Sequence, residues 1–142
     1  MNFLLDTNVV SEPTKPQPDS GVIDWLAEAD EDHVFLSVVT LAELRHGVER
    51  LDAGARRSRL DRWLTDELPI RFEGRLLQID LEIADAWGRI MARAQRGGRP
   101  MAVMDAFIAA TALRHGLTLV TRNVRDFEGT GVLLCNPWRD QE

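Results

Sequence analysis

Four carboxylates stand where predicted strands and helices meet, and these are the residues best placed to do chemistry. Asp6 follows an apolar run, Asp126 comes shortly after another, and Glu43 and Asp105 lie at the starts of predicted helices. Two carboxylates about 4 Å apart repel by about 4 kcal/mol at an effective dielectric of about 20. Three in one cleft therefore need a proton or a cation. An all-oxygen set favours Mg²⁺ or Mn²⁺, which would lower the pKa of a bound water and polarise a phosphoryl oxygen for phosphodiester hydrolysis.

Each acid also has a purely structural interpretation. Asp105 is a candidate helix N-cap, and Asp6 is a candidate turn residue. The stretch from Thr40 to Glu43 matches a capping box, in which the glutamate reaches back to the amide of the cap residue. Asp126 is a candidate solvated loop acid paired with the arginine before it. Because short motifs also match by chance, the metal-centre hypothesis depends on the four acids converging.

The elements that must position these acids alternate between strand and helix. Apolar spacing predicts a helix from about Thr40 to Leu51, another over Arg56–Leu68 that Pro69 ends, and two more that stop at Gly97 and Gly116. A short helix is predicted over VIDWL, strands in NFLL, HVFLSVV, LTLV and VLL, and a loop in SEPTKPQPDSG. Such alternation predicts an α/β fold with a mainly parallel sheet of four or five strands. Ligands bind such sheets outside the carboxyl ends of the strands, and Asp6 lies at one of them.

The composition is that of a folded chain of ordinary domain size. At 142 residues it fits one domain over residues 1–142, and 44% hydrophobic with 28% charged residues argues against disorder. No apolar run is long enough to span a bilayer, and the N-terminus has no basic segment of the kind that begins a secretory signal. Because Cys135 is the only cysteine, no internal disulfide can form. We therefore expect the protein in the cytoplasm.

The net charge of −6 leaves nucleic-acid binding open. Sixteen of the seventeen basic residues are arginines, clustered over residues 45–62 and 89–99, and the arginine fork suits phosphate. The simpler interpretation, which we favour for most of them, is that they line solvated helix faces. The sequence has neither a GxxxxGK[ST] loop nor a GxSxG elbow, and no cysteine or histidine stands out as an alternative nucleophile. Trp138 is the one aromatic residue that we consider for stacking or partner contact.

The motifs LLDTNVVSE, SVVTLAELRHGVE, MDAFIAATA, LVTRNVRDFEGTGV and NPW, in that order, resemble the PIN-domain family, specifically the VapC toxins and their FitB branch. The resemblance runs from Phe3 to Trp138, and SEPTKPQP with the closing NPW point towards FitB-like members. It implies a PIN-like three-layer α/β/α fold.

The resemblance also implies roles for particular residues. Asp6, Glu43 and Asp105 take the family's metal-coordinating positions. Some relatives have an acid directly after the TR of the last long motif, where this chain has Asn123. Asp126 is then the expected substitute, while Asn123 remains able to hold a metal-bound water, so one-metal and two-metal chemistry both stay open. Thr7 and Asn8 are expected to orient Asp6 by hydrogen bonds, and Thr121 to do the same near the last acid.

Family members are Mg²⁺-dependent endoribonucleases that cleave structured RNA, often transfer RNA, and form homodimers. By resemblance we expect a cognate VapB- or FitA-like antitoxin that inhibits the chain, with operator DNA bound only through that antitoxin. The helix carrying Arg56, Arg57 and Arg59 is expected to form part of the clamp that receives it.

Two other functions compete with the nuclease hypothesis. A FitB-like regulatory module would bind operator DNA together with its partner and have little nuclease activity. A phosphatase of the haloacid-dehalogenase type also places an aspartate after its first strand. That chemistry needs a second aspartate two residues later, where this chain has Asn8.

Overall fold

A five-stranded sheet runs through the centre of the molecule, and all of its strands are parallel. The computed structural model describes residues 1–139, with the strand order β3-β2-β1-β4-β5. In the register, Leu4 of β1 lies between Phe35 of β2 and Leu119 of β4. The strands are β1 (Phe3–Leu5), β2 (Val34–Ser37), β3 (Leu76–Leu77), β4 (Thr118–Val120) and β5 (Leu134–Cys135).

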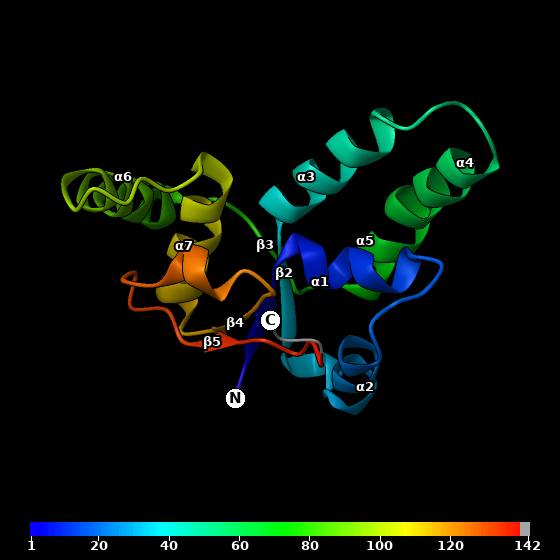
Figure 1. The fold of residues 1–142 in the computed structure, drawn as a ribbon, viewed down its shortest axis with the longest axis horizontal. Helices are drawn as coiled ribbons and strands as arrows, with labels where there is room; N and C mark the ends of the chain where they lie inside the picture. Colours follow the sequence, from blue (N-terminus) through cyan, green and yellow to red (C-terminus); the bar gives the residue numbers. More distant parts are fainter. Residues whose placement is uncertain (140–142) are drawn as a thin grey trace.

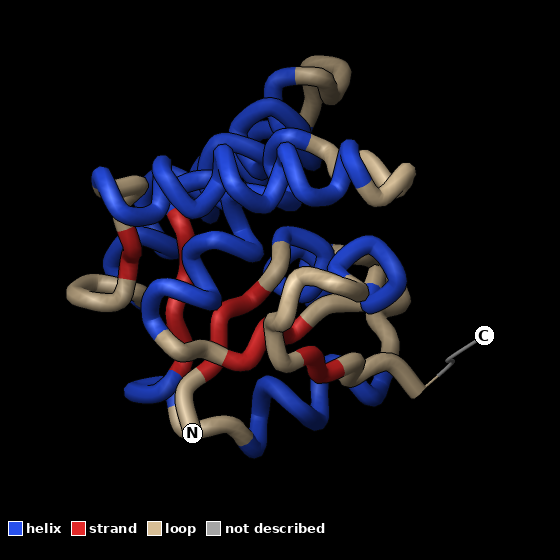
Figure 2. Tube along the Cα trace, turned by 90° about the vertical axis from the view of Figure 1, so that its left-hand side faces the viewer, coloured by secondary structure: helices blue, strands red, loops and turns tan. Residues whose placement is uncertain are grey.

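Helices cover both faces of this sheet, which gives the predicted three-layer α/β/α fold (Figures 1 and 2). One group follows β1 and β2, and the other lies between β3 and β4. The first group is α1 (Thr7–Ser11), α2 (Ser20–Glu28), α3 (Val38–Glu49), α4 (Ala55–Arg62) and α5 (Leu68–Arg71); the second is α6 (Leu81–Arg96) and α7 (Val103–His115). Among the described residues, no helix is both long and apolar enough to cross a membrane.

Alternation along the central strands divides the core between the two faces. Leu4 and Leu119 pack with α6 and α7, whereas Leu5 and Val120 pack with α1 to α5. Neighbouring side chains of a strand point to opposite faces, so each three-residue strand supplies both cores. The result is a pair of apolar clusters separated by one sheet.

Several boundaries differ from the sequence prediction. The helix α1, which precedes the predicted loop of residues 11–21, was not predicted, and that loop begins with the last residue of α1 and a short 3₁₀ helix over Glu12–Thr14. Pro69 does not end the helix before it, because a π-helical stretch over Trp63–Glu67 leads into α5, where Pro69 takes an early position that needs no N–H bond. The two-residue strand β3 was not predicted.

The start of α3 replaces the predicted capping box. The side chain of Ser37 accepts a hydrogen bond from the Val39 N–H at 3.0 Å, so Ser37 is the N-cap and the helix begins at Val38. Thr40 is fully buried in the first turn, and its hydroxyl has no hydrogen-bond partner among the residues that the structure describes. The capping interpretation of Thr40 and Glu43 was therefore wrong, and Glu43 is left available for another contact.

The two hydroxyls should respond in opposite directions to removal. Thr40→Val keeps the shape and removes an unsatisfied buried hydroxyl, so we expect the free energy of unfolding to stay level or rise by about 1 kcal/mol. Ser37→Ala removes the cap and should lower it by about 1 kcal/mol. Urea denaturation followed by circular dichroism measures both. A loss of stability in Thr40→Val as large as that in Ser37→Ala would contradict the roles assigned to these two hydroxyls.

Candidate metal centre

The candidate site lies where the direction of the chain through the sheet reverses. β2 and β3 are on one side of β1, and β4 and β5 are on the other, so the switch point lies between β1 and β4. The segments that leave these two strands pack on opposite faces, which opens a crevice at their carboxyl ends. Asp6 directly follows β1, and Thr121 directly follows β4.

Asp6 is held in this crevice by donors from both strands' ends. Its carboxylate accepts hydrogen bonds at 2.8 Å from the Thr7 N–H and at 2.8 Å from the Thr121 hydroxyl, and the Asn8 amide lies at 3.5 Å. The residue is only 5% exposed. Burial raises the pKa of Asp6, the bonds from Thr121 and Thr7 oppose that rise, and the charge of Asp126 adds to it.

Glu43 reaches the same crevice from α3. The hydroxyl of Thr7 donates a hydrogen bond to its Oε1 at 2.7 Å. Thr7 therefore connects two acids, because its N–H contacts Asp6 while its side chain contacts Glu43. The sequence prediction placed Thr7 beside Asp6 and did not include this second bond.

Asp105 enters from the first turn of α7. The N-cap of that helix is Ala102, so the N-cap interpretation of Asp105 was wrong. Burial raises the pKa of Asp105 to about 6, and the negative charges of Asp6, Asp126 and Glu43 contribute to the rise. The charges of the other three acids therefore act on Asp105, and a metal site shared by all four acids stays a prediction.

Asn123 and Asp126, the two candidates for the fourth position of the site, both follow β4 but make different contacts. The Asn123 N–H donates to the Thr121 hydroxyl at 3.0 Å, so Asn123 steadies the donor that holds Asp6. Asp126 lies in a 3₁₀ helix over Val124–Phe127, is exposed, and borders a pocket together with Asp105. No ion pair joins Asp126 to Arg125 within the described part of the chain. Of the two candidates, Asp126 is the one that adds charge to the crevice.

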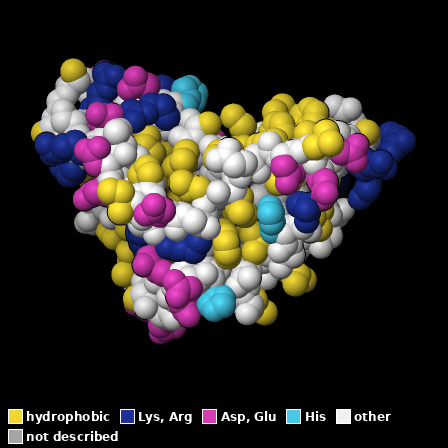
Figure 3. Space-filling view, turned by 180° about the vertical axis from the view of Figure 1, so that it is seen from behind, with side chains coloured by type: hydrophobic (Ala, Val, Ile, Leu, Met, Phe, Trp, Pro, Cys, Tyr) yellow, Lys and Arg dark blue, Asp and Glu magenta, His cyan; other side chains and the backbone are white. Residues whose placement is uncertain are grey.

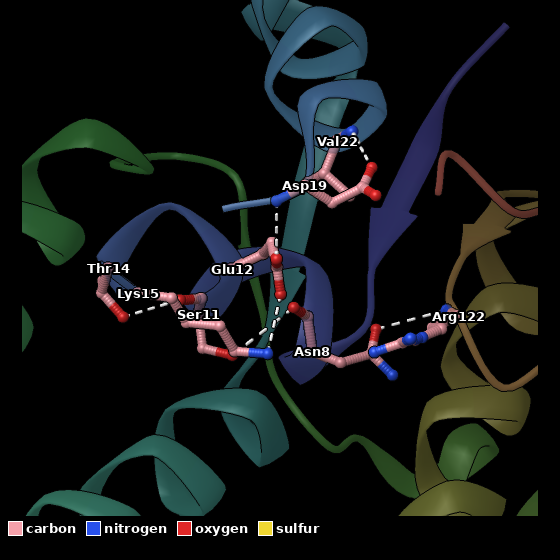
Figure 4. Close-up of polar contacts among 8 residues, drawn as sticks. All are labelled: Asn8, Ser11, Glu12, Thr14, Lys15, Asp19, Val22 and Arg122. Atoms are coloured by element: carbon pink, nitrogen blue, oxygen red, sulfur yellow. Dashed lines mark hydrogen bonds and ion pairs between the residues drawn. The ribbon is translucent and has the colours of Figure 1, made fainter. Parts of the chain in front are cut away.

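A buried carboxylate that the sequence prediction missed fastens the loop after α1. Glu12 is 4% exposed, pairs with Lys15 at 2.8 Å and accepts from the Asp19 N–H at 2.8 Å (Figure 4). Burial raises the pKa of Glu12, but these two bonds and the charges of Lys15 and Arg122 outweigh it and leave the pKa lowered. The Arg122 N–H in turn donates to the Asn8 side-chain oxygen at 3.3 Å, which ties α1 to the residue that follows Thr121. In the sequence Glu12 stands directly before Pro13, and nothing there distinguishes it from a solvated loop acid.

Trp138 does not present the exposed aromatic face that we expected. It is 2% exposed within the α1–α5 core, and the Arg122 guanidinium lies 5.4 Å from its ring centroid. The aromatic residue in NPW is thus part of the packing beneath the site.

Within residues 1–139, no three His, Cys, Asp or Glu side chains are grouped closely enough to hold a metal ion as they stand.

Comparison with known proteins agrees with this architecture. The PIN domain family model matches residues 3–132. The chain is 41% identical to Toxin FitB of Neisseria gonorrhoeae, over 97% of this chain and 99% of that one. It is 38% identical to the VapC ribonuclease Y4jK of Sinorhizobium fredii, over 96% and 97% of the two chains. It is 30% identical to the tRNA(fMet)-specific endonuclease VapC of Shigella flexneri, over 97% and 98%.

A solved structure of FitAB bound to an IR36 DNA fragment has the same fold, with a TM-score of 0.90 and 37% identity over 99% of this chain and 98% of the other. The family model covers most of the sequence, and full-length relatives share more than a third of its residues. The chain belongs to the PIN-domain family.

Proposed function

We propose that this chain is a Mg²⁺-dependent endoribonuclease, the toxin of a toxin–antitoxin pair, and that it forms one domain over residues 1–142, of which 140–142 lie outside the described residues. The observation that carries the proposal is the crevice in which residues at the ends of two strands fix Asp6, while the charges of Asp6, Glu43 and Asp126 act on Asp105. Relatives named as ribonucleases and endonucleases support the same activity.

The donor set fits a hard divalent cation. All four side chains offer carboxylate oxygens, and their mutual repulsion is the condition that a cation relieves. Mg²⁺ often takes only one or two direct carboxylates and keeps several waters, so a preformed group of three ligands is not required. Asp6 and Asp105 would hold Mg²⁺, or Mn²⁺ in its place, with Glu43 and Asp126 beside them. When bound, the ion supplies positive charge to the phosphodiester and lowers the pKa of a water.

The protein's own residues orient the reactants. Thr121 and Thr7 fix the Asp6 carboxylate, and Thr7 also restrains Glu43. In the proposed reaction a water attacks phosphorus in line with the departing ribose oxygen. Asp105, whose pKa is about 6 in the metal-free protein, would be ionised once it holds the cation, because the positive charge favours the carboxylate form.

The proposed partners follow from the relatives. FitAB, whose solved structure includes DNA, supports a FitA-like antitoxin through which this chain would meet operator DNA. The Shigella relative supports transfer RNA as a substrate class. We also propose a homodimer. In the clamp helix α4, Arg57 already pairs with Glu49 at 3.1 Å, so Arg56 and Arg59, which are exposed, are the better candidates for contact with the antitoxin.

The FitAB–DNA structure also favours the second candidate, a regulatory module with little nuclease activity. A net charge of −6 disfavours DNA binding by the chain alone, because affinity for DNA rests on neutralising phosphates. Operator binding that requires this chain, in a preparation without Mg²⁺-stimulated RNA cleavage, would favour the module over the nuclease.

Loss of the Asp6 carboxylate should abolish cleavage while the fold survives. We expect Asp6→Asn to reduce Mg²⁺-dependent cleavage of a labelled transfer RNA by more than about 100-fold, and Thr121→Val, which removes only the orienting hydroxyl, by about 10- to 100-fold. EDTA should abolish wild-type cleavage. Thr118→Val, in the strand that ends directly before Thr121, and Asp32→Asn on the surface are the matched controls. Undiminished cleavage by folded Asp6→Asn protein would end the proposal.

Metal-free protein should become more stable when Asp105 is neutralised. Because folding raises its pKa from 3.8 to about 6, the folded state binds a proton more tightly, and stability falls as pH rises between those values. At pH 7.5 we expect Asp105→Asn to gain on the order of 1–2 kcal/mol after solvent screening is allowed for, and to gain little at pH 3.5.

Thermal unfolding in EDTA at the two pH values measures this difference, with Asp32→Asn as the control. Added Mg²⁺ should raise the Tm of the wild type and change that of Asp105→Asn much less, because an ion that binds only the folded state stabilises it. Equal gains at both pH values would show that Asp105 does not titrate in the crevice.

A further inference from the structure

A second hollow adjoins the acidic crevice. Its volume is about 420 Å³, within the range of about 300–1,000 Å³ for small-ligand sites. It shares Asp105 and Asp126 with the crevice and continues from them towards the end of α6. In the space-filling view from behind, a notch separates the lobe of α3 and α4 from the lobe of α6 and α7 (Figure 3). The rest of its lining comes from α6 (Ile90, Arg93, Ala94), the following loop (Gly97, Arg99, Pro100, Met101, Ala102) and the 3₁₀ region (Arg125, Glu128, Gly129, Thr130).

The lining combines an apolar surface with two arginines that are not committed elsewhere. Ile90 and Met101 supply apolar contact area. Arg99 pairs with Glu128 at 3.4 Å. Arg93 and Arg125 have no carboxylate within ion-pair distance in the part of the chain that the structure describes. Two guanidinium groups beside an apolar surface match a nucleotide, because arginine binds phosphate through its fork and stacks on bases.

The walls of the pocket are fastened in place without a ligand. Trp87 of α6 stacks on Phe107 of α7, with 5.1 Å between the ring centroids. The indole N–H of Trp87 donates to the Val103 carbonyl at 3.1 Å. The Arg99 N–H donates to the Ala94 carbonyl at 2.9 Å, which fixes the loop after α6. A pocket formed in advance spends little binding energy on ordering its own residues.

We propose that this pocket binds one unpaired nucleotide of the RNA substrate, next to the phosphodiester that is cleaved. Its base contacts Ile90 and Met101, and its phosphate contacts Arg93 and Arg125. This inference rests on the proposed nuclease function and adds a substrate-positioning subsite to it. An acidic peptide would use the arginines but would leave the apolar surface without a partner, and for that reason RNA is the occupant that the lining favours.

Binding can be measured separately from cleavage in the Asp6→Asn background. The probe is a fluorescein-labelled single-stranded RNA of mixed sequence, followed by anisotropy in EDTA. We expect Arg93→Ala and Arg125→Ala each to weaken binding about tenfold. Arg89→Ala is the matched control. Arg89 is also an arginine of α6, but it lies outside this pocket and pairs with Asp85 at 2.9 Å, so its loss should change RNA binding less than about twofold. Arg93→Lys, which keeps the positive charge, should bind the RNA more tightly than Arg93→Ala and less tightly than the parent protein.

A second measurement reports on the pocket without any activity. In protein labelled with ¹³C at the methionine methyl groups, adenosine 5′-monophosphate should shift the signal of Met101, assigned with Met101→Leu, and leave that of Met1 unchanged. Ribose 5-phosphate should shift it less, because it lacks the base. The pocket proposal would be overturned if both arginine variants bind RNA as tightly as the parent and Met101 shows no shift. If the wild-type chain still cleaves RNA, the nuclease proposal would stand. A shift at Met101 in a chain that cleaves no RNA would preserve the pocket and overturn the nuclease.

Discussion

Repulsion among carboxylates is the constraint around which this fold is arranged. Asp6, with its pKa raised by burial, stands at the sheet's carboxyl edge, and Asp105 responds to the charges of three other acids. Hydrogen-bond donors offset part of the electrostatic cost of placing these acids near one another: Thr7 and Thr121 hold Asp6, and Thr7 restrains Glu43. The proposed cation would relieve the remaining cost. Full satisfaction of these acids by protein donors would remove the reason for a cation to bind.

The order of the strands explains why so few residues are enough to build the crevice. β1 is central, and the elements that leave β1, β2 and β4 all begin at the same edge of the sheet. The hydrogen bond from Thr121 to Asp6 joins residues 115 positions apart, and it can do so because β1 and β4 are neighbours in register. A parallel sheet thus converts distant sequence positions into contacts at one end.

The sequence predicted the central parts of the fold and of the site and failed where tertiary contacts decide the local structure. Apolar periodicity located α6 and α7, and apolar runs located four of the five strands. The two residues of β3 were too few to give a pattern, although pairing with β2 makes them a strand. Thr40 fitted a capping box, but the buried Ser37 hydroxyl cap starts the helix earlier. Glu12 gave no signal because its partners, Lys15, the Asp19 amide and Arg122, come together only in the folded chain.

The arginines show how an acidic chain can still present local positive charge. Within residues 1–139, carboxylates pair with seven of them and so neutralise them locally: Arg45, Arg57, Arg71, Arg89, Arg99, Arg114 and Arg139. The expectation that most line solvated faces holds for these. Exposed pairs of this kind contribute little stability, about 0–1 kcal/mol each. Because these arginines are neutralised, the local positive charge comes from arginines without such a pair, such as Arg93 and Arg125 beside the acidic crevice. Attraction of a phosphate backbone depends on that local arrangement within about a Debye length, so the net charge of −6 does not decide it.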